Sequence, residues 1–137
     1  MSPEKKAPEA AEPRDVYALG LQVRRDMFGV AGADQQIEAA TDFTRPLQDM
    51  VTRYCFGEVW NRPALDRKTR SMLTLALLTA LGKQNQLRVH VRGAIENGVS
   101  KEEIREVLMH SLIYAGLPAA VDSFATTSEV LKQMGLE

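Results

Sequence analysis

Two side chains that could take part in acid–base chemistry lie two residues apart in the segment QLRVHVRGAIENG, residues 86–98. His90 has an ordinary pKa of about 6.5, so its imidazole can exchange a proton near neutral pH. Arg92 carries a permanent positive charge that can hold a carboxylate through two parallel hydrogen bonds. Together they would supply proton transfer and electrostatic stabilisation by a fixed cation.

Each candidate residue also has a purely structural explanation. A histidine beside an apolar helix stripe is more often a hydrogen-bonded packing residue than a catalyst, and Arg92 alone would be an ordinary surface or interface cation. Glu58, just before Trp60 in FGEVWNR, could be a helix-end carboxylate that pairs with Arg62 four residues later. Residue type alone therefore does not decide between packing and catalysis.

Further polar residues lie near predicted helix ends. Arg70 follows two other cations at the start of a helix, where positive charge opposes the helix dipole, so helix stability does not explain it. His110 and Tyr114 are four residues apart and share one helix face, which fits either packing or a pocket wall.

Several kinds of chemistry have no signature in the sequence. There is no glycine-rich phosphate loop, no dinucleotide-binding fingerprint and no nucleophile elbow. Two histidines and one cysteine, without a nearby carboxylate cluster, argue against a metal site. An enzyme with this sequence is expected to work without metal or cofactor, on a substrate that supplies its own electron sink.

The segments that would position these residues read as consecutive helices with short connections. Gly29 and the AGAD stretch are expected to close the first helix, and Ser100 with Glu103 forms a capping box. The expected helices cover residues 15–28, a segment from about 41 to the GEVWNRP stretch, 67–81, 84–96, 101–115 and a last helix that begins near Pro118. This pattern predicts an all-α, single-domain bundle of about six helices over residues 15–137.

Two features of this pattern favour an oligomer. Residues 67–81 are apolar nearly all round, so the helix should be buried by its own chain or by a partner chain. At 100° per residue, His90 and Arg92 lie on opposite flanks of the apolar stripe of their helix, so they cannot face one pocket unless the site wraps around that helix. We therefore expect a homo-oligomer with sites near subunit contacts.

Composition narrows the partners and the compartment. The 137 residues carry a net charge of −1, which gives no global attraction to nucleic acid or anionic membranes. The single cysteine, Cys55, fits a reducing compartment, and we find neither a signal-peptide core nor an apolar run long enough to span a bilayer. Residues 1–14 contain three prolines among Lys, Glu and Ala and read as a flexible tail. The expected location is cytoplasmic.

Three motifs taken together identify a resemblance: GEVWNRPALDRKTRS, LRVHVRGAIENGVSKEEI and IYAGLPAAVDSF. From about Tyr17 to Val130, the chain resembles the carboxymuconolactone decarboxylase family. The resemblance implies an all-helical fold of the alkylhydroperoxidase D-like type, a homotrimer or homohexamer, a small-molecule lactone substrate and no cofactor. The thiol pair of the alkylhydroperoxidase D-like branch would fall on Lys83 and Gln86, so disulfide-based peroxide chemistry is not expected.

The activity that the resemblance implies is decarboxylation of 4-carboxymuconolactone to 3-oxoadipate enol-lactone in the β-ketoadipate pathway of protocatechuate breakdown. Guided by that chemistry, we assign His90 as the proton donor or oxyanion partner. Glu58 is the candidate for holding the histidine tautomer or relaying the proton. Arg92 is expected to bind a substrate carboxylate.

Three further residues are predicted to bind substrate. Arg70 is a second candidate for carboxylate binding, and Trp60 and Tyr114 are expected pocket walls. Two alternatives stay open at this point: a cofactor-free decarboxylase or isomerase acting on another lactone or β-keto acid, and a catalytically silent oligomeric binding protein with this fold.

Overall fold

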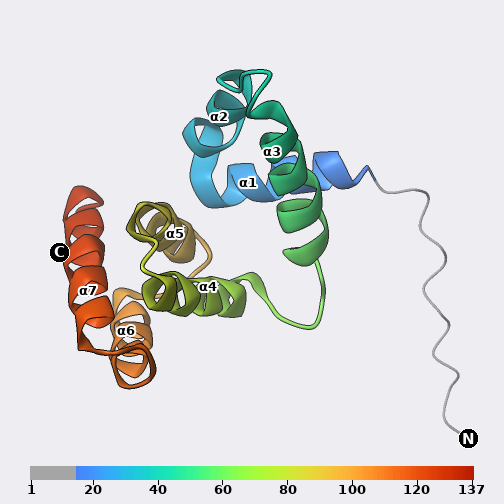
Figure 1. The fold of residues 1–137 in the computed structure, drawn as a ribbon. Helices are drawn as coiled ribbons and strands as arrows, with labels where there is room; N and C mark the ends of the chain where they lie inside the picture. Colours follow the sequence, from blue (N-terminus) through green and yellow to red (C-terminus); the bar gives the residue numbers. More distant parts are fainter. Residues whose placement is uncertain (1–14) are drawn as a thin grey trace, which may run out of the picture.

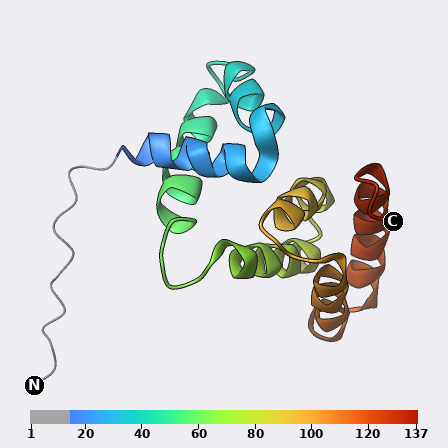
Figure 2. The same cartoon turned by 180° about the vertical axis from the view of Figure 1, so that it is seen from behind.

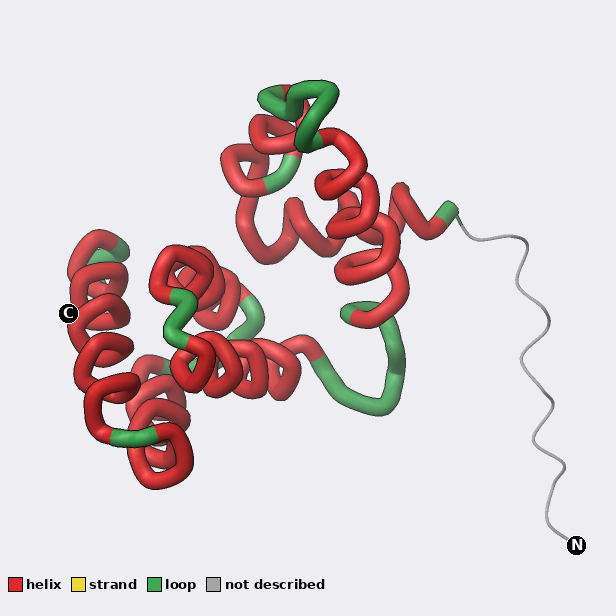
Figure 3. The backbone as a smooth tube through the Cα atoms, in the orientation of Figure 1, coloured by secondary structure: helices red, strands yellow, loops and turns green. Residues whose placement is uncertain are grey.

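The computed structural model describes residues 15–137, and the predicted flexible tail of residues 1–14 lies outside this range. Helices follow one another along the whole described segment, and no strand occurs in it (Figure 1, Figure 3). The elements are α1 (Val16–Gly32), α2 (Asp34–Glu38), α3 (Arg45–Met50), the π-helix η1 (Val51–Val59), α4 (Arg67–Leu81), α5 (Gln84–Glu96), α6 (Lys101–Ala115) and α7 (Leu117–Gln133). The predicted all-α class is confirmed.

Side-chain caps set the beginnings of α4 and α6, and a glycine sets the end of α4. The Asp66 carboxylate accepts a hydrogen bond from the Thr69 backbone N–H at 2.7 Å and so starts α4. Ser100 and Glu103 form the predicted capping box of α6. Gly82 ends α4 in the left-handed conformation, with φ of 69°. These caps confirm the predicted bounds of the helices over 67–81 and 101–115.

The N-terminal third agrees with the prediction at Gly29 and differs from it in two places after that residue. The regular part of α1 ends at Gly29, whose φ of 68° and ψ of −174° are not helical, and a short helical segment then runs to Gly32. The AGAD stretch leads into the short helix α2. The single helix expected after Thr41 consists of α3 followed directly by η1. A π-helical turn leaves no distinct hydrophobic period, so the sequence pattern could not distinguish it from an α-helix.

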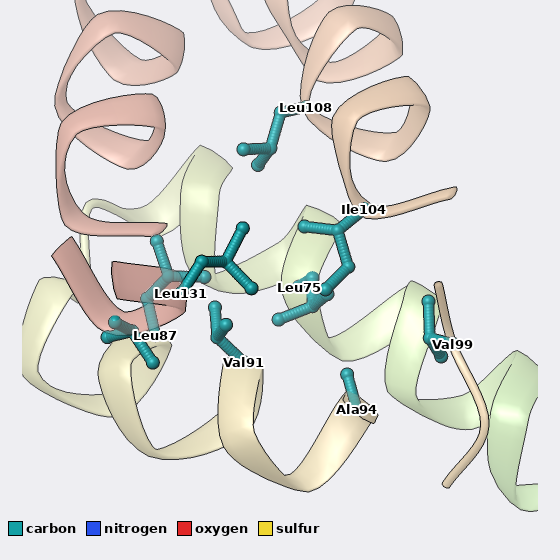
Figure 4. Close-up of a cluster of buried hydrophobic side chains, with 9 residues drawn as sticks. Leu75, Leu87, Val91, Ala94, Val99, Ile104, Leu108 and Leu131 are labelled. Atoms are coloured by element: carbon teal, nitrogen blue, oxygen red, sulfur yellow. The ribbon is translucent and has the colours of Figure 1, made fainter. Parts of the chain in front are cut away.

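One hydrophobic core lies among the last four helices. Figure 4 shows Leu75 of α4 pointing toward Val91 of α5 and Ile104 of α6. The buried members of this core are Leu75, Leu87, Val91, Ala94, Val99, Ile104, Leu108, Val130 and Leu131. This core fixes the position of α5, the helix that carries His90.

A second core joins α1 to η1, and its centre is Val23, Met27, Phe56 and Trp60. The two helices cross at Gly20 and Gly57, where an added Cβ would overlap the carbonyl oxygen of Thr52 or Val16, respectively. Gly93 of α5 likewise allows a close approach to α1, because a Cβ there would lie 2.7 Å from the Phe28 ring. Figures 1 and 2 show α5 between the α1 side of the molecule and α7.

Large apolar side chains remain exposed on the outer faces of α4, α6 and α7 in the single chain. The exposed residues are Leu73, Leu77, Leu81, Met109, Ile113, Tyr114, Leu117 and Val121. The helix predicted to be buried on every side is therefore only partly covered by its own chain. Among residues 15–137, no helix has the length and hydropathy needed to cross a bilayer.

Candidate active site

His90 sits between two aromatic rings contributed by other parts of the chain. The Phe28 ring of α1 meets it edge-on, with 5.4 Å between ring centroids and 88° between planes. The Trp60 ring, just after η1, stacks on it at 6.4 Å and 21°. Its Nδ1 atom is buried and has no hydrogen-bond partner in the described part of the chain. The imidazole is therefore held by packing and retains unused hydrogen-bonding capacity.

This apolar setting controls the charge of the ring. Burial lowers the pKa of His90 from its ordinary value of 6.5 to about 4, because the aromatic surroundings replace the water that would stabilise the imidazolium. At neutral pH the ring is therefore neutral, with one N–H donor and one acceptor nitrogen.

The low pKa predicts a specific pH dependence of stability. The unfolded chain protonates this ring near pH 6.5, whereas the folded protein does so only near pH 4. The stability contribution is complete above pH 6.5 and is lost as the pH falls to about 4, a total of about 3 kcal/mol of unfolding free energy.

Urea unfolding of the wild type and of His90→Gln, measured in parallel from pH 7 to pH 4, isolates this contribution. The carboxylates titrate in both proteins, so their effect cancels in the difference between the two unfolding free energies. We expect the wild type to lose about 3 kcal/mol of unfolding free energy relative to His90→Gln as the pH falls from 7 to 4. A constant difference would show that His90 titrates normally in the folded protein.

His90 opens onto a cavity of about 450 Å³, a volume within the range of about 300–1,000 Å³ typical of small-molecule sites. The cavity is formed by α1, α2, α3, η1 and α5, so it joins segments from both halves of the sequence. Its lining residues are Arg24, Phe28, Gly32, Gln36, Leu47, Gln48, Val51, Cys55, Phe56, Gln86, Val89 and His90. Most of the wall is apolar, and its polar groups are one cation, one histidine, one thiol and three amides.

Arg24 is the cavity residue that the sequence analysis missed. It is 5% exposed, and its Nη1 donates to Gln48 Oε1 and to Thr52 Oγ1, both at 2.9 Å. Its Nη2 donates to the Gly32 carbonyl at 3.2 Å. Desolvation by burial lowers the pKa of this guanidinium, which nonetheless stays charged. The sequence signal was its spacing, four residues after Gly20 on the buried face of α1.

The structure places Trp60 beside His90 but Glu58 and Arg92 elsewhere. Glu58 is exposed on η1 and does not line the His90 cavity. Arg92 is exposed, donates to Gln133 Oε1 at 2.8 Å, and lines a separate cavity of about 680 Å³ formed by α1, α5 and α7. His90 and Arg92 therefore face different cavities, as helical geometry predicts.

The remaining predicted residues also lie outside the His90 cavity. Arg70 is partly buried on α4, where its Nη2 donates to the Arg62 carbonyl at 3.2 Å. Its buried Nε has no hydrogen-bond partner among the residues that the structure describes. Tyr114 is 81% exposed on α6 and packs against His110, with 4.9 Å between ring centroids. Within residues 15–137, no three His, Cys, Asp or Glu side chains are grouped closely enough to hold a metal ion.

Comparison with known proteins gives one family match. The sequence profile described as "Carboxymuconolactone decarboxylase family" matches residues 45–129. That range begins at α3 and includes η1, α4, α5 and α6 and most of α7, and so contains both Trp60 and His90.

Individual relatives carry two different activities in their names. A 4-carboxymuconolactone decarboxylase of Acinetobacter baylyi is 41% identical over 120 residues, which cover 88% of this chain and 90% of the relative. Nitrosuccinic acid decarboxylase npaB of Metarhizium robertsii is 40% identical over 121 residues, which cover 88% and 85%. A 4-carboxymuconolactone decarboxylase of Pseudomonas putida is 40% identical over 42 residues, which cover 31% and 88%.

Proposed function

The chain belongs to the carboxymuconolactone decarboxylase family and is a decarboxylase of that family, and we propose that its substrate is 4-carboxymuconolactone, converted to 3-oxoadipate enol-lactone in the β-ketoadipate pathway. The observation that carries this proposal is the His90 cavity, where a neutral imidazole and a buried cation share a largely apolar space. The cytoplasm is the compartment that we expect for this reaction.

The reaction needs little from the protein beyond binding and hydrogen bonding. The bond between the ring γ carbon and its carboxylate breaks, and its electron pair moves through the ring double bond into the lactone carbonyl. CO₂ leaves and a dienolate forms, which takes up one proton at the carbon next to that carbonyl. Because the lactone accepts the electrons, the reaction needs a donor for the developing oxyanion and a source of that proton.

Before substrate binds, His90 is neutral and is therefore suited to donate a hydrogen bond to the developing oxyanion. A neutral imidazole can donate a hydrogen bond to an oxyanion, and the Phe28 and Trp60 rings packed against it strengthen that interaction by excluding water. An anionic substrate near the ring would also raise its pKa and so favour protonation, in which case His90 would deliver the proton to carbon. Both roles place His90 at the reacting atoms.

Nitrosuccinate is the second candidate substrate, favoured by the 40% identity to the relative that carries this name. Its leaving carboxylate is attached to the carbon that bears the nitro group. That nitro group accepts electrons as the lactone carbonyl does. Both acids also keep a carboxymethyl group, –CH₂–COO⁻, after CO₂ has left. One cavity could therefore serve either acid with the same anchoring and oxyanion-stabilising groups.

A two-substrate comparison tests the proposal. We would measure kcat/KM for 4-carboxymuconolactone and for nitrosuccinate with the same purified protein, and follow CO₂ release in both cases. We expect the lactone to be preferred by at least about tenfold, which corresponds to about 1.4 kcal/mol of differential transition-state binding. A preference for nitrosuccinate would assign the chain to that chemistry.

We further propose that the protein works as a homotrimer or homohexamer. Support comes from the exposed apolar residues on α4, α6 and α7, among them Leu77 and Ile113, which are 62% and 74% exposed in the single chain. Light scattering coupled to size exclusion should give three or six times the 15.2 kDa chain mass. Leu77→Glu with Ile113→Glu should reduce that mass, and a monomeric wild type would contradict the proposal.

A further inference from the structure

We propose that Arg24 binds the carboxylate that the substrate keeps, the one on its carboxymethyl arm, and so orients the leaving carboxylate and the electron sink toward His90. The inference rests on the proposed function for the identity of the substrate. It concerns a residue outside the segment matched by the family profile, which begins at residue 45.

The first support is that the positive charge of Arg24 has no anionic partner among residues 15–137. All three of its hydrogen bonds go to neutral acceptors: an amide, a hydroxyl and a backbone carbonyl. Asp34, which acts on it from a distance, is already bound by Arg25 through three N–H···O contacts of 2.6, 3.0 and 3.2 Å. Buried charges are costly unless paired, so a 5% exposed arginine without a carboxylate among the described residues favours binding of an anion beside it.

The second support is position. Arg24 on α1 and His90 on α5 line the same cavity, whereas Arg92 lines another. Gln48 and Thr52 hold one edge of the guanidinium, which fixes its plane and lets the group meet a carboxylate without losing further side-chain freedom. One small acid bound in this cavity would therefore have both a cation and the His90 imidazole on the walls around it.

A charge-compensating variant separates carboxylate binding from support of the fold. Gln48→Glu keeps the shape of the side chain and its contact with Arg24 Nη1, but places a permanent anion against the guanidinium. If Arg24 only supports the fold, this anion should weaken binding of an acid no more than an anion placed elsewhere on the cavity wall. If Arg24 binds the substrate carboxylate, the new carboxylate should compete with it while the protein stays at least as stable.

The binding probe is muconolactone, which has the carboxymethyl arm but hydrogen in place of the leaving carboxylate, compared with its neutral methyl ester. Calorimetric titration of the wild-type oligomer should show muconolactone bound at least about tenfold more tightly than the ester. Gln48→Glu and Arg24→Lys should each remove most of that preference, while ester binding changes little. Gln36→Glu adds the same charge on the wall of the same cavity, where the side chain has no hydrogen bond to Arg24, and is the matched control.

Each outcome of this titration decides the inference independently of turnover. A preference for the acid that is lost in Gln48→Glu but largely kept in Gln36→Glu supports carboxylate binding at Arg24. Equal binding of acid and ester by the wild type, or a preference that survives in Gln48→Glu, overturns it. Should the wild type prefer the acid yet fail to decarboxylate either candidate substrate, the proposed function fails and the anion site stands.

Discussion

Replacement of His90 by glutamine is expected to lower kcat/KM for decarboxylation by about 10²–10⁴, the usual contribution of a positioned proton donor or oxyanion partner. Glutamine is polar and of similar length, but it cannot exchange a proton, and its amide would not reproduce the packing between Phe28 and Trp60. The effect should fall mainly on kcat, because the group acts on charge that develops in the transition state. Initial rates with saturating lactone measure it.

His110→Gln is the matched control, since His110 is the other histidine in the chain and lies exposed on α6. Its turnover should match that of the wild type. Circular dichroism and light scattering would establish that both variants keep their fold and assembly. Near wild-type turnover by a folded His90→Gln protein would remove His90 from the chemistry.

Gly20→Ala is expected to destabilise the fold by about 3 kcal/mol, at the upper end of the usual cost of overpacking. The new methyl group would overlap the Thr52 carbonyl oxygen at the crossing of α1 and η1, and backbone cannot move aside as a flexible side chain can. Separation of these two helices would also displace Arg24 and Phe28 from the cavity. Urea unfolding and turnover should therefore decline together.

Gly135→Ala provides the comparison for this substitution. No atom lies within 4 Å of the added methyl group, so its cost comes only from the left-handed backbone (φ 74°), about 1 kcal/mol. Turnover should be unchanged in this variant. If Gly20→Ala costs no more than Gly135→Ala, the close α1–η1 crossing does not contribute to stability.

Much of the fold could be predicted because local signals and burial agree in the C-terminal half. Asp66, Ser100 with Glu103, and Gly82 each act on their own helix end, so their effect can be deduced from adjacent residues. The N-terminal third depends on contacts between distant segments. Gly29 marks the break of α1 in the sequence, but the π-helical hydrogen bonding of η1 has no comparable local signal.

The same difference between local signals and long-range contacts explains which site residues could be predicted from the sequence. His90 attracts attention because a titratable ring on an apolar helix is unusual at the sequence level. Arg24 in LQVRRDMFG has the same residue type as its exposed neighbour Arg25, and only its helical spacing from Gly20 and Met27 distinguishes it in the sequence. The packing of α1 against η1 shows that Arg24 is the buried one. Arg92, Glu58, Arg70 and Tyr114 lie outside the His90 cavity within one chain, so their predicted roles require a contribution from a neighbouring subunit.

The central claim, decarboxylation of 4-carboxymuconolactone at the His90 cavity, is tested most directly by one assay. Freshly generated 4-carboxymuconolactone would be mixed with the purified, EDTA-dialysed wild-type oligomer, and lactone consumption and CO₂ release would be followed together. We expect saturable turnover with one CO₂ released for each lactone consumed. A folded, assembled protein that consumes no lactone, or consumes it without releasing CO₂, would contradict the proposed reaction.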